Sequence, residues 1–213
     1  MAGAPLNADV LRDSLRTLQL DGKRISVNLP LLERMYDLNA EIAIKFPADL
    51  GNGMGQMGLL LNTRLENGGY WCTPTNSLSF GGTGGDGAHF SFLITDRTIT
   101  DKTPVIISVP DYFGEPQDDN VVLGRGFEDF VRLGLHCGYF SMARFAFNAD
   151  DALIHYARTD WDDAESWFPG DNHRVVAEYV SKTLDLTCLV YSRDEFAAMQ
   201  SEVKPLMRFK DAV

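Results

Sequence analysis

The chain has 213 residues, of which 45% are hydrophobic and 23% are charged, and its formal net charge is −11. A chain of this length and composition can bury a core of its own, which excludes a disordered protein and a small domain held together by disulfides. No stretch approaches the roughly 20 apolar residues of a membrane span, and the N-terminus lacks the apolar run of a signal peptide. We therefore expect a soluble, cytoplasmic protein that does not bind membranes.

The negative charge is concentrated in two stretches. Residues 111–119 contain four acids and no Lys or Arg, and residues 149–172 contain seven acids and a single Arg. Such a field repels a phosphate backbone, which argues against direct nucleic-acid binding. It attracts a basic protein and speeds the encounter with it. The alternative is that the acidity only maintains solubility.

Two amphipathic helices are predicted at the start of the chain. The first covers about residues 7–18, where Asn7 can cap the helix N-terminus. The second covers about residues 29–45, where apolar residues recur three and four apart, and it ends before Pro47.

The middle of the chain has the pattern of short strands separated by turns. Runs of β-branched and aromatic residues predict strands at residues 70–73, 77–80, 89–95, 105–109 and 120–123. Adjacent strands joined by loops too short for a crossover must pair antiparallel. We therefore predict a small twisted antiparallel sheet with helices covering one face, which is an α+β fold.

Helical periodicity returns after the strands. We predict helical segments from Phe127, over residues 173–184, and from Ser192 to about Leu206, with Glu195 placed to complete a capping box, and helical or apolar structure over residues 142–147. Residues 187–191 have the pattern of a strand or an extended piece. The whole chain is expected to be one domain, residues 1–213, with an acidic helical extension from about residue 150.

The glycine-rich segment Gly81–Gly87, GGTGGDG, is the most conspicuous local motif. A phosphate cradle would need a helix after it and a lysine within it, whereas this segment leads into a strand and contains Asp86. The glycines are better explained by turns with positive φ and by bulges at a strand junction.

No catalytic or metal-binding constellation is recognisable in the sequence. The four histidines, His89, His136, His155 and His173, lack the spacing of metal ligands, and the three cysteines, Cys72, Cys137 and Cys188, form no CxxC pair. We expect reduced thiols, no metal, no cofactor and no enzyme activity. The alternative is a small-molecule hydrolase whose site is assembled from distant residues, for instance His89, Asp86 and His155.

The acidic aromatic run of residues 160–168 is the best candidate for an interface. Tryptophans between carboxylates can combine anchoring in a partner's pocket with attraction to a basic partner. The alternative is that both tryptophans are core residues of a surface helix. The predicted partner-binding residues of the two acidic stretches are Asp111, Glu115, Asp118, Asp119, Asp160, Trp161, Asp162, Asp163, Glu165 and Trp167.

The order and spacing of several turns and aromatic positions resemble the SUKH superfamily, which contains bacterial immunity proteins and yeast cell-wall-synthesis regulators. The similarity extends from about residue 30 to residue 140. The matching features are the helix ending at Phe46-Pro47, the ENGG turn at Glu66–Gly69, the glycine junction at Ser79–Gly87, the strand opening at Pro104-Val105 and the helix GFEDFV at Gly126–Val131.

This resemblance implies a SUKH-like α+β fold that binds a bacterial toxin domain, often a nuclease or deaminase. It implies no cofactor and no catalytic residues. The leading expectation is therefore an immunity protein of a toxin–antitoxin pair in bacterial competition, which neutralises a basic toxin domain. A regulatory protein–protein interaction scaffold is the second hypothesis, and the hydrolase named above is the third. The sequence leaves the oligomeric state open.

Overall fold

The computed structural model describes residues 6–16, 18–20, 22–47, 53–84, 87–110, 114–157 and 172–210, without the side chains of Cys137 and Asn172. The α-helices are α1 (Ala8–Leu15), α2 (Pro30–Lys45), α3 (Phe127–Cys137), α4 (Arg144–Phe147), α5 (Ala149–Ala157), α6 (Asn172–Leu184) and α7 (Arg193–Val203). Short 3-10 helices are η1 (Gly53–Met57), η2 (Phe140–Ala143) and η4 (Lys204–Leu206). The strands are β1 (Gln19–Leu20), β2 (Lys23–Arg24), β3 (Ser26–Asn28), β4 (Leu60–Glu66), β5 (Ser77–Gly82), β6 (His89–Leu93), β7 (Thr98–Thr100), β8 (Val105–Ser108) and β9 (Asn120–Gly124).

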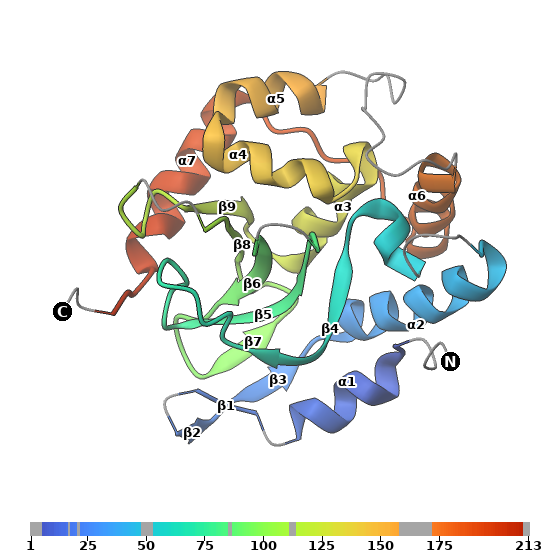
Figure 1. Cartoon of the computed structure of the whole chain (residues 1–213), viewed down its shortest axis with the longest axis horizontal. Coiled ribbons are helices and arrows are strands. Elements are labelled where there is room, and N and C mark those ends of the chain that lie inside the picture. The colour runs from blue at the N-terminus through green and yellow to red at the C-terminus, as the bar shows by residue number, and fades with distance from the viewer. Residues whose placement is uncertain are drawn as a thin grey trace.

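Five strands form an antiparallel sheet in the order β4-β5-β6-β8-β9 at the centre of the molecule (Figure 1). Helices precede and follow this meander in the chain, so the predicted α+β class with a mostly antiparallel sheet is confirmed. Two smaller sheets were not predicted: the hairpin β1-β2, and a parallel pair in which Val27 of β3 lies opposite Ile99 of β7. Strands of two or three residues are too short to leave a period-2 pattern in the sequence.

One face of the central sheet carries an aromatic core. Phe90 and Phe92 alternate along β6 toward this face and pack around Phe80 of β5. Phe127 and Phe130 of α3 contact the same ring edge-on, with centroid distances of 5.3 and 5.2 Å. All five rings are completely buried, so α3 is fixed against the sheet by apolar packing.

The opposite face of the sheet carries polar side chains. His89, Ser108 and Asn120 lie opposite one another in register on β6, β8 and β9, and all are buried. The Asn120 amide donates to the Cys72 carbonyl at 2.7 Å, and the Ser108 hydroxyl donates to the Asn120 side-chain oxygen at 2.6 Å. The turn that contains Cys72 therefore covers this polar row.

The predicted helix boundaries are largely confirmed. Asn7 caps α1 by accepting from the backbone N–H groups of Asp9 and Val10. The second predicted helix is α2, which begins at Pro30 and ends at Lys45 as expected. Positive φ angles at Gly84 and Gly87, and a register shift between Ser79 and Gly81, confirm turns and a bulge in the glycine segment.

One predicted strand is wrong, and one segment predicted as a strand or an extended piece is extended. Residues 70–73 form a turn, because the Thr73 N–H donates back to the Tyr70 carbonyl and Pro74 follows directly. Residues 187–191 are extended but belong to no described sheet, and the Leu189 N–H donates instead to the Arg132 carbonyl of α3. A local turn outweighs strand propensity in the first segment, and the contact with α3 does so in the second.

Candidate functional site: an acidic surface around helix α7

The first acidic stretch is exposed only in part. Glu115 and Asp118 are exposed, whereas Asp111 lies outside the described residues. Asp119 is only 6% exposed. Burial of the Cys72 thiol raises its pKa to about 11, and the negative charge of Asp119 is the second cause of this shift. Its carboxylate is therefore much less accessible to a partner than those of Glu115 and Asp118.

The described part of the second acidic stretch is the start of α5. Asp150 and Asp151 are exposed there, and Asn148 accepts a hydrogen bond from the Asp151 N–H at 3.2 Å. Acids in a first turn interact favourably with the helix dipole. The remaining predicted interface residues lie outside the described part of the chain: Asp160, Trp161, Asp162, Asp163, Glu165 and Trp167.

Helix α7 connects the described parts of the two stretches. Its first residue, Arg193, forms an ion pair with Asp150 of α5. Lys204 follows directly after the last residue of α7, and its ammonium group donates to the Gln117 carbonyl at 3.4 Å. Burial lowers the pKa of Lys204, and the negative charge of Asp118 opposes that shift. A helix of 11 residues is about 16 Å long. The two stretches, which are separate in sequence, thus lie at opposite ends of one helix.

The sequence of α7 explains its position. Ser192 and Glu195 form a complete capping box, as the sequence predicts. The hydrogen bonds from Ser192 lower the pKa of Glu195. Phe196, Met199 and Val203 are buried one turn apart. The outer side of the helix therefore faces solvent and presents further acids.

We call the resulting surface the α7 acidic face. Its exposed acids are Glu115, Asp118, Asp150, Asp151, Asp194, Glu195 and Glu202. Three cations lie among them: Arg193, Lys204, and Arg125, which contacts Glu202 at 3.2 Å. Figure 1 shows α7 at the edge of the molecule, next to α5. The acids of α7 itself were not predicted as site residues, because in sequence they resemble the ordinary charges of a solvated helix.

A cavity of about 390 Å³ is the other candidate site. It lies where β4 separates from β5, between the paired positions Leu61 and Glu66 of β4. Asn62, Tyr70 and His89 line it together with glycines of the segment at residues 81–87. The glycine motif of the sequence therefore forms the wall of a small pocket.

His89 in this cavity is held in one neutral form. The Gly87 carbonyl can only accept, so the ring Nδ1 donates to it at 2.8 Å, and Nε2 then accepts from the Thr73 hydroxyl at 3.1 Å. Burial lowers the pKa of His89, and the hydrogen bond to Gly87 opposes this shift. With both nitrogens engaged, the ring has no free position for taking a proton from a substrate.

The alternative hydrolytic site is not assembled in the described structure. His155 lies on α5, which packs against α4, and is not among the residues that line the His89 cavity. Asp86 lies outside the described residues. Of the three named residues, only His89 lines this cavity within the described part of the chain.

The described residues contain no group of three or more His, Cys, Asp or Glu side chains that could hold a metal ion. Cys72 and Cys188 are free thiols, the first buried and the second exposed. Burial raises the pKa of both, so neither is predominantly a thiolate at neutral pH. None of the helices in the described ranges is long and apolar enough to cross a membrane.

Compared with known proteins, the chain matches no family model, no curated protein and no solved structure. The resemblance to the SUKH superfamily therefore remains a prediction from the motifs.

Proposed function

We propose that this protein binds a basic protein partner through the α7 acidic face and acts as an immunity protein for a bacterial toxin domain. The observation that supports the proposal is the ion pair between Arg193 and Asp150 at one end of α7, with Lys204 beside Asp118 at the other. The two acidic stretches then contribute to one continuous docking surface.

The chemistry of nucleic-acid-directed toxins fits such a surface. Their active-site clefts bind phosphate backbones and are therefore basic. An acidic face resembles that substrate in charge, attracts the cleft and excludes the nucleic acid from it. Such binding requires no cofactor or catalytic residue of its own, and it would take place in the cytoplasm, where the toxin acts.

The test is a co-expression assay with a toxin domain encoded next to this chain. We expect growth to be restored when both proteins are made, and a stable complex to form from the purified proteins. Absence of both protection and complex formation would contradict the immunity function. A complex without protection would favour the regulatory scaffold.

The predicted interface can be tested in the same assay. Changing Asp160, Asp162 and Asp163 together to Lys should slow association with the toxin and reduce its dependence on salt. Association kinetics that stay unchanged would remove the second acidic stretch from the interface.

A further inference from the structure

A second groove lies on the N-terminal side of the molecule, between α1 and strand β3. Its volume is about 620 Å³, which is within the usual range of ligand sites. Residues 24–27 form one wall. Arg12 and Leu15 of α1, together with Arg16 directly after the helix, form the other. The groove shares no lining residue with the His89 cavity.

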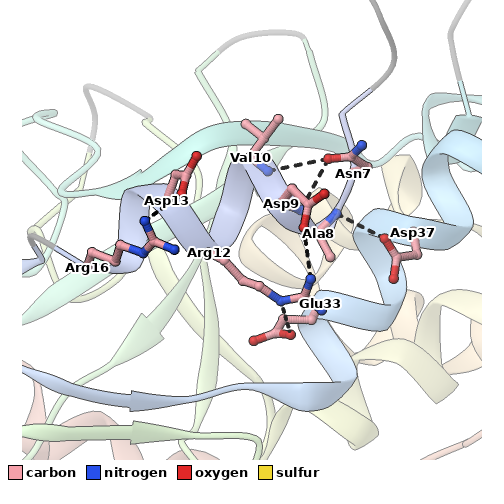
Figure 2. A network of polar contacts seen from close by, with 9 residues as sticks. All are labelled: Asn7, Ala8, Asp9, Val10, Arg12, Asp13, Arg16, Glu33 and Asp37. Carbon is pink, nitrogen blue, oxygen red and sulfur yellow. Dashed lines mark hydrogen bonds and ion pairs between the residues drawn. The ribbon is translucent and has the colours of Figure 1, made fainter.

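The groove is basic in an otherwise acidic protein. Arg12, Arg16 and Arg24 line it against a single carboxylate, that of Glu33. Figure 2 shows Arg12 extending from α1 to Glu33 on α2, where the two side chains meet at 2.8 Å. Arg12 is therefore held in place, and its charge is largely neutralised.

The other two arginines are more available to a ligand. Arg16 contacts Asp13 at 3.3 Å, but both side chains are more than 70% exposed, and such a pair contributes little and exchanges readily. Arg24 is exposed and has no ion pair with any residue in the described ranges. Two guanidinium groups can thus turn toward an anion in the groove.

Strand β3 adds a backbone recognition element to this wall. Among the described strands it pairs only with β7. The Ser26 N–H donates to the Arg97 carbonyl at 2.9 Å on the β7 side. Because backbone groups of successive strand residues point to alternate edges, the N–H and C=O of Val27 point away from β7, and Val27 is among the residues that line the groove.

We propose that the groove binds an extended acidic peptide segment of a partner protein. The segment adds to the free edge of β3 through hydrogen bonds with the Val27 backbone, while its carboxylates contact Arg16 and Arg24. This mode obtains affinity from main-chain bonds and selectivity from the side chains on alternate positions. The ligand has the opposite charge to the toxin proposed for the α7 acidic face, so the two surfaces bind different partners.

The test uses a fluorescein-labelled, end-capped peptide of sequence Glu-Val-Glu-Val-Glu and the full chain, measured by fluorescence anisotropy. We expect saturable binding that weakens at least tenfold in the double variant Arg16→Glu with Arg24→Glu. The double variant Arg174→Glu with Lys182→Glu, at exposed positions of α6, is the charge-matched control and should leave binding nearly unchanged. Urea denaturation of each variant verifies that it is folded.

A second peptide distinguishes strand addition from attraction of any anion. N-methylation of both valines removes their backbone donors and should weaken binding at least tenfold. The proposal is overturned if the unmodified peptide does not bind at millimolar concentration or if the control double variant on α6 weakens binding as much as Arg16→Glu with Arg24→Glu. Equal binding of the methylated peptide, with competition by phosphate, would also overturn it and indicate a small-anion site.

Discussion

Gln200 of α7 forms two hydrogen bonds with the backbone of Val122 on β9. Its side-chain oxygen accepts from the Val122 N–H at 3.0 Å, and its side-chain nitrogen donates to the Val122 carbonyl at 2.8 Å. The amide thus takes the place of a neighbouring strand at the edge of the central sheet. It also fixes the middle of α7, and with it the α7 acidic face, relative to the core.

Replacement of Gln200 should destabilise the protein without changing its surface charge. In Gln200→Leu both Val122 groups lose their partners, and we expect a loss of about 1–3 kcal/mol in the free energy of unfolding. Urea denaturation monitored by circular dichroism measures it. Ser201→Ala, at the adjacent exposed position, should stay within about 0.5 kcal/mol of the parent protein. Equal effects of the two substitutions would contradict this role of Gln200.

Gly68 and Gly69 form a matched pair for a second prediction. A Cβ at Gly68 would lie 2.3 Å from His89 Nε2, whereas a Cβ at Gly69 would meet nothing within 4 Å but requires a φ of +76°. Gly69→Ala should therefore cost only about 1 kcal/mol of backbone strain. Gly68→Ala should cost more, because the buried His89 ring and its bond to Thr73 must move. A thermal denaturation series that ranks the two the other way would show that the packing described for His89 is wrong.

The stability of the protein should depend on pH through His89. Burial holds its pKa in the folded protein below the ordinary value of 6.5. Above that pH the ring is neutral in both states, so the full stability is present. As the pH falls from 6.5 toward the lower folded pKa, the unfolded chain takes up a proton that the folded chain excludes, and stability is lost.

His173 contributes in the same direction, because burial lowers its pKa as well. The free energy of unfolding should therefore decrease as the pH falls below 6.5, as measured by urea denaturation at several pH values. NMR titration of the ring protons separates the two histidines. A His89 resonance that titrates at or above pH 6.5 would contradict the prediction.

The sequence was sufficient for features that depend on neighbouring residues. The caps at Asn7 and Ser192 follow from side chains within one helical turn of their partners, and the boundaries of α2 follow from Pro30 at its start and Pro47 after its end. The antiparallel pairing of β5, β6, β8 and β9 follows from short loops, whereas strand β4 was not predicted. These contacts are local, so a single chain without homologues determines them.

Features that depend on distant residues were not predictable in this way. The N-terminus of α2 receives the Asp101 carboxylate, which accepts from the Leu31 N–H at 3.0 Å across 70 residues. The burial of Asp119 and the pairing of Arg193 with Asp150 likewise depend on packing between separate segments. The sequence therefore predicted the acidic stretches and helix α7, but not that α7 joins them.

The association rate with a basic toxin domain, measured by stopped-flow fluorescence over a range of salt concentrations, tests the α7 acidic face most directly. Asp118→Lys with Asp194→Lys should lower the rate at low salt at least tenfold and flatten its salt dependence. Asp13→Lys with Glu178→Lys changes the net charge equally on other exposed surfaces and should have a much smaller effect. If both pairs of substitutions slow association to the same extent, net charge alone steers the partner and the α7 acidic face is not its docking surface.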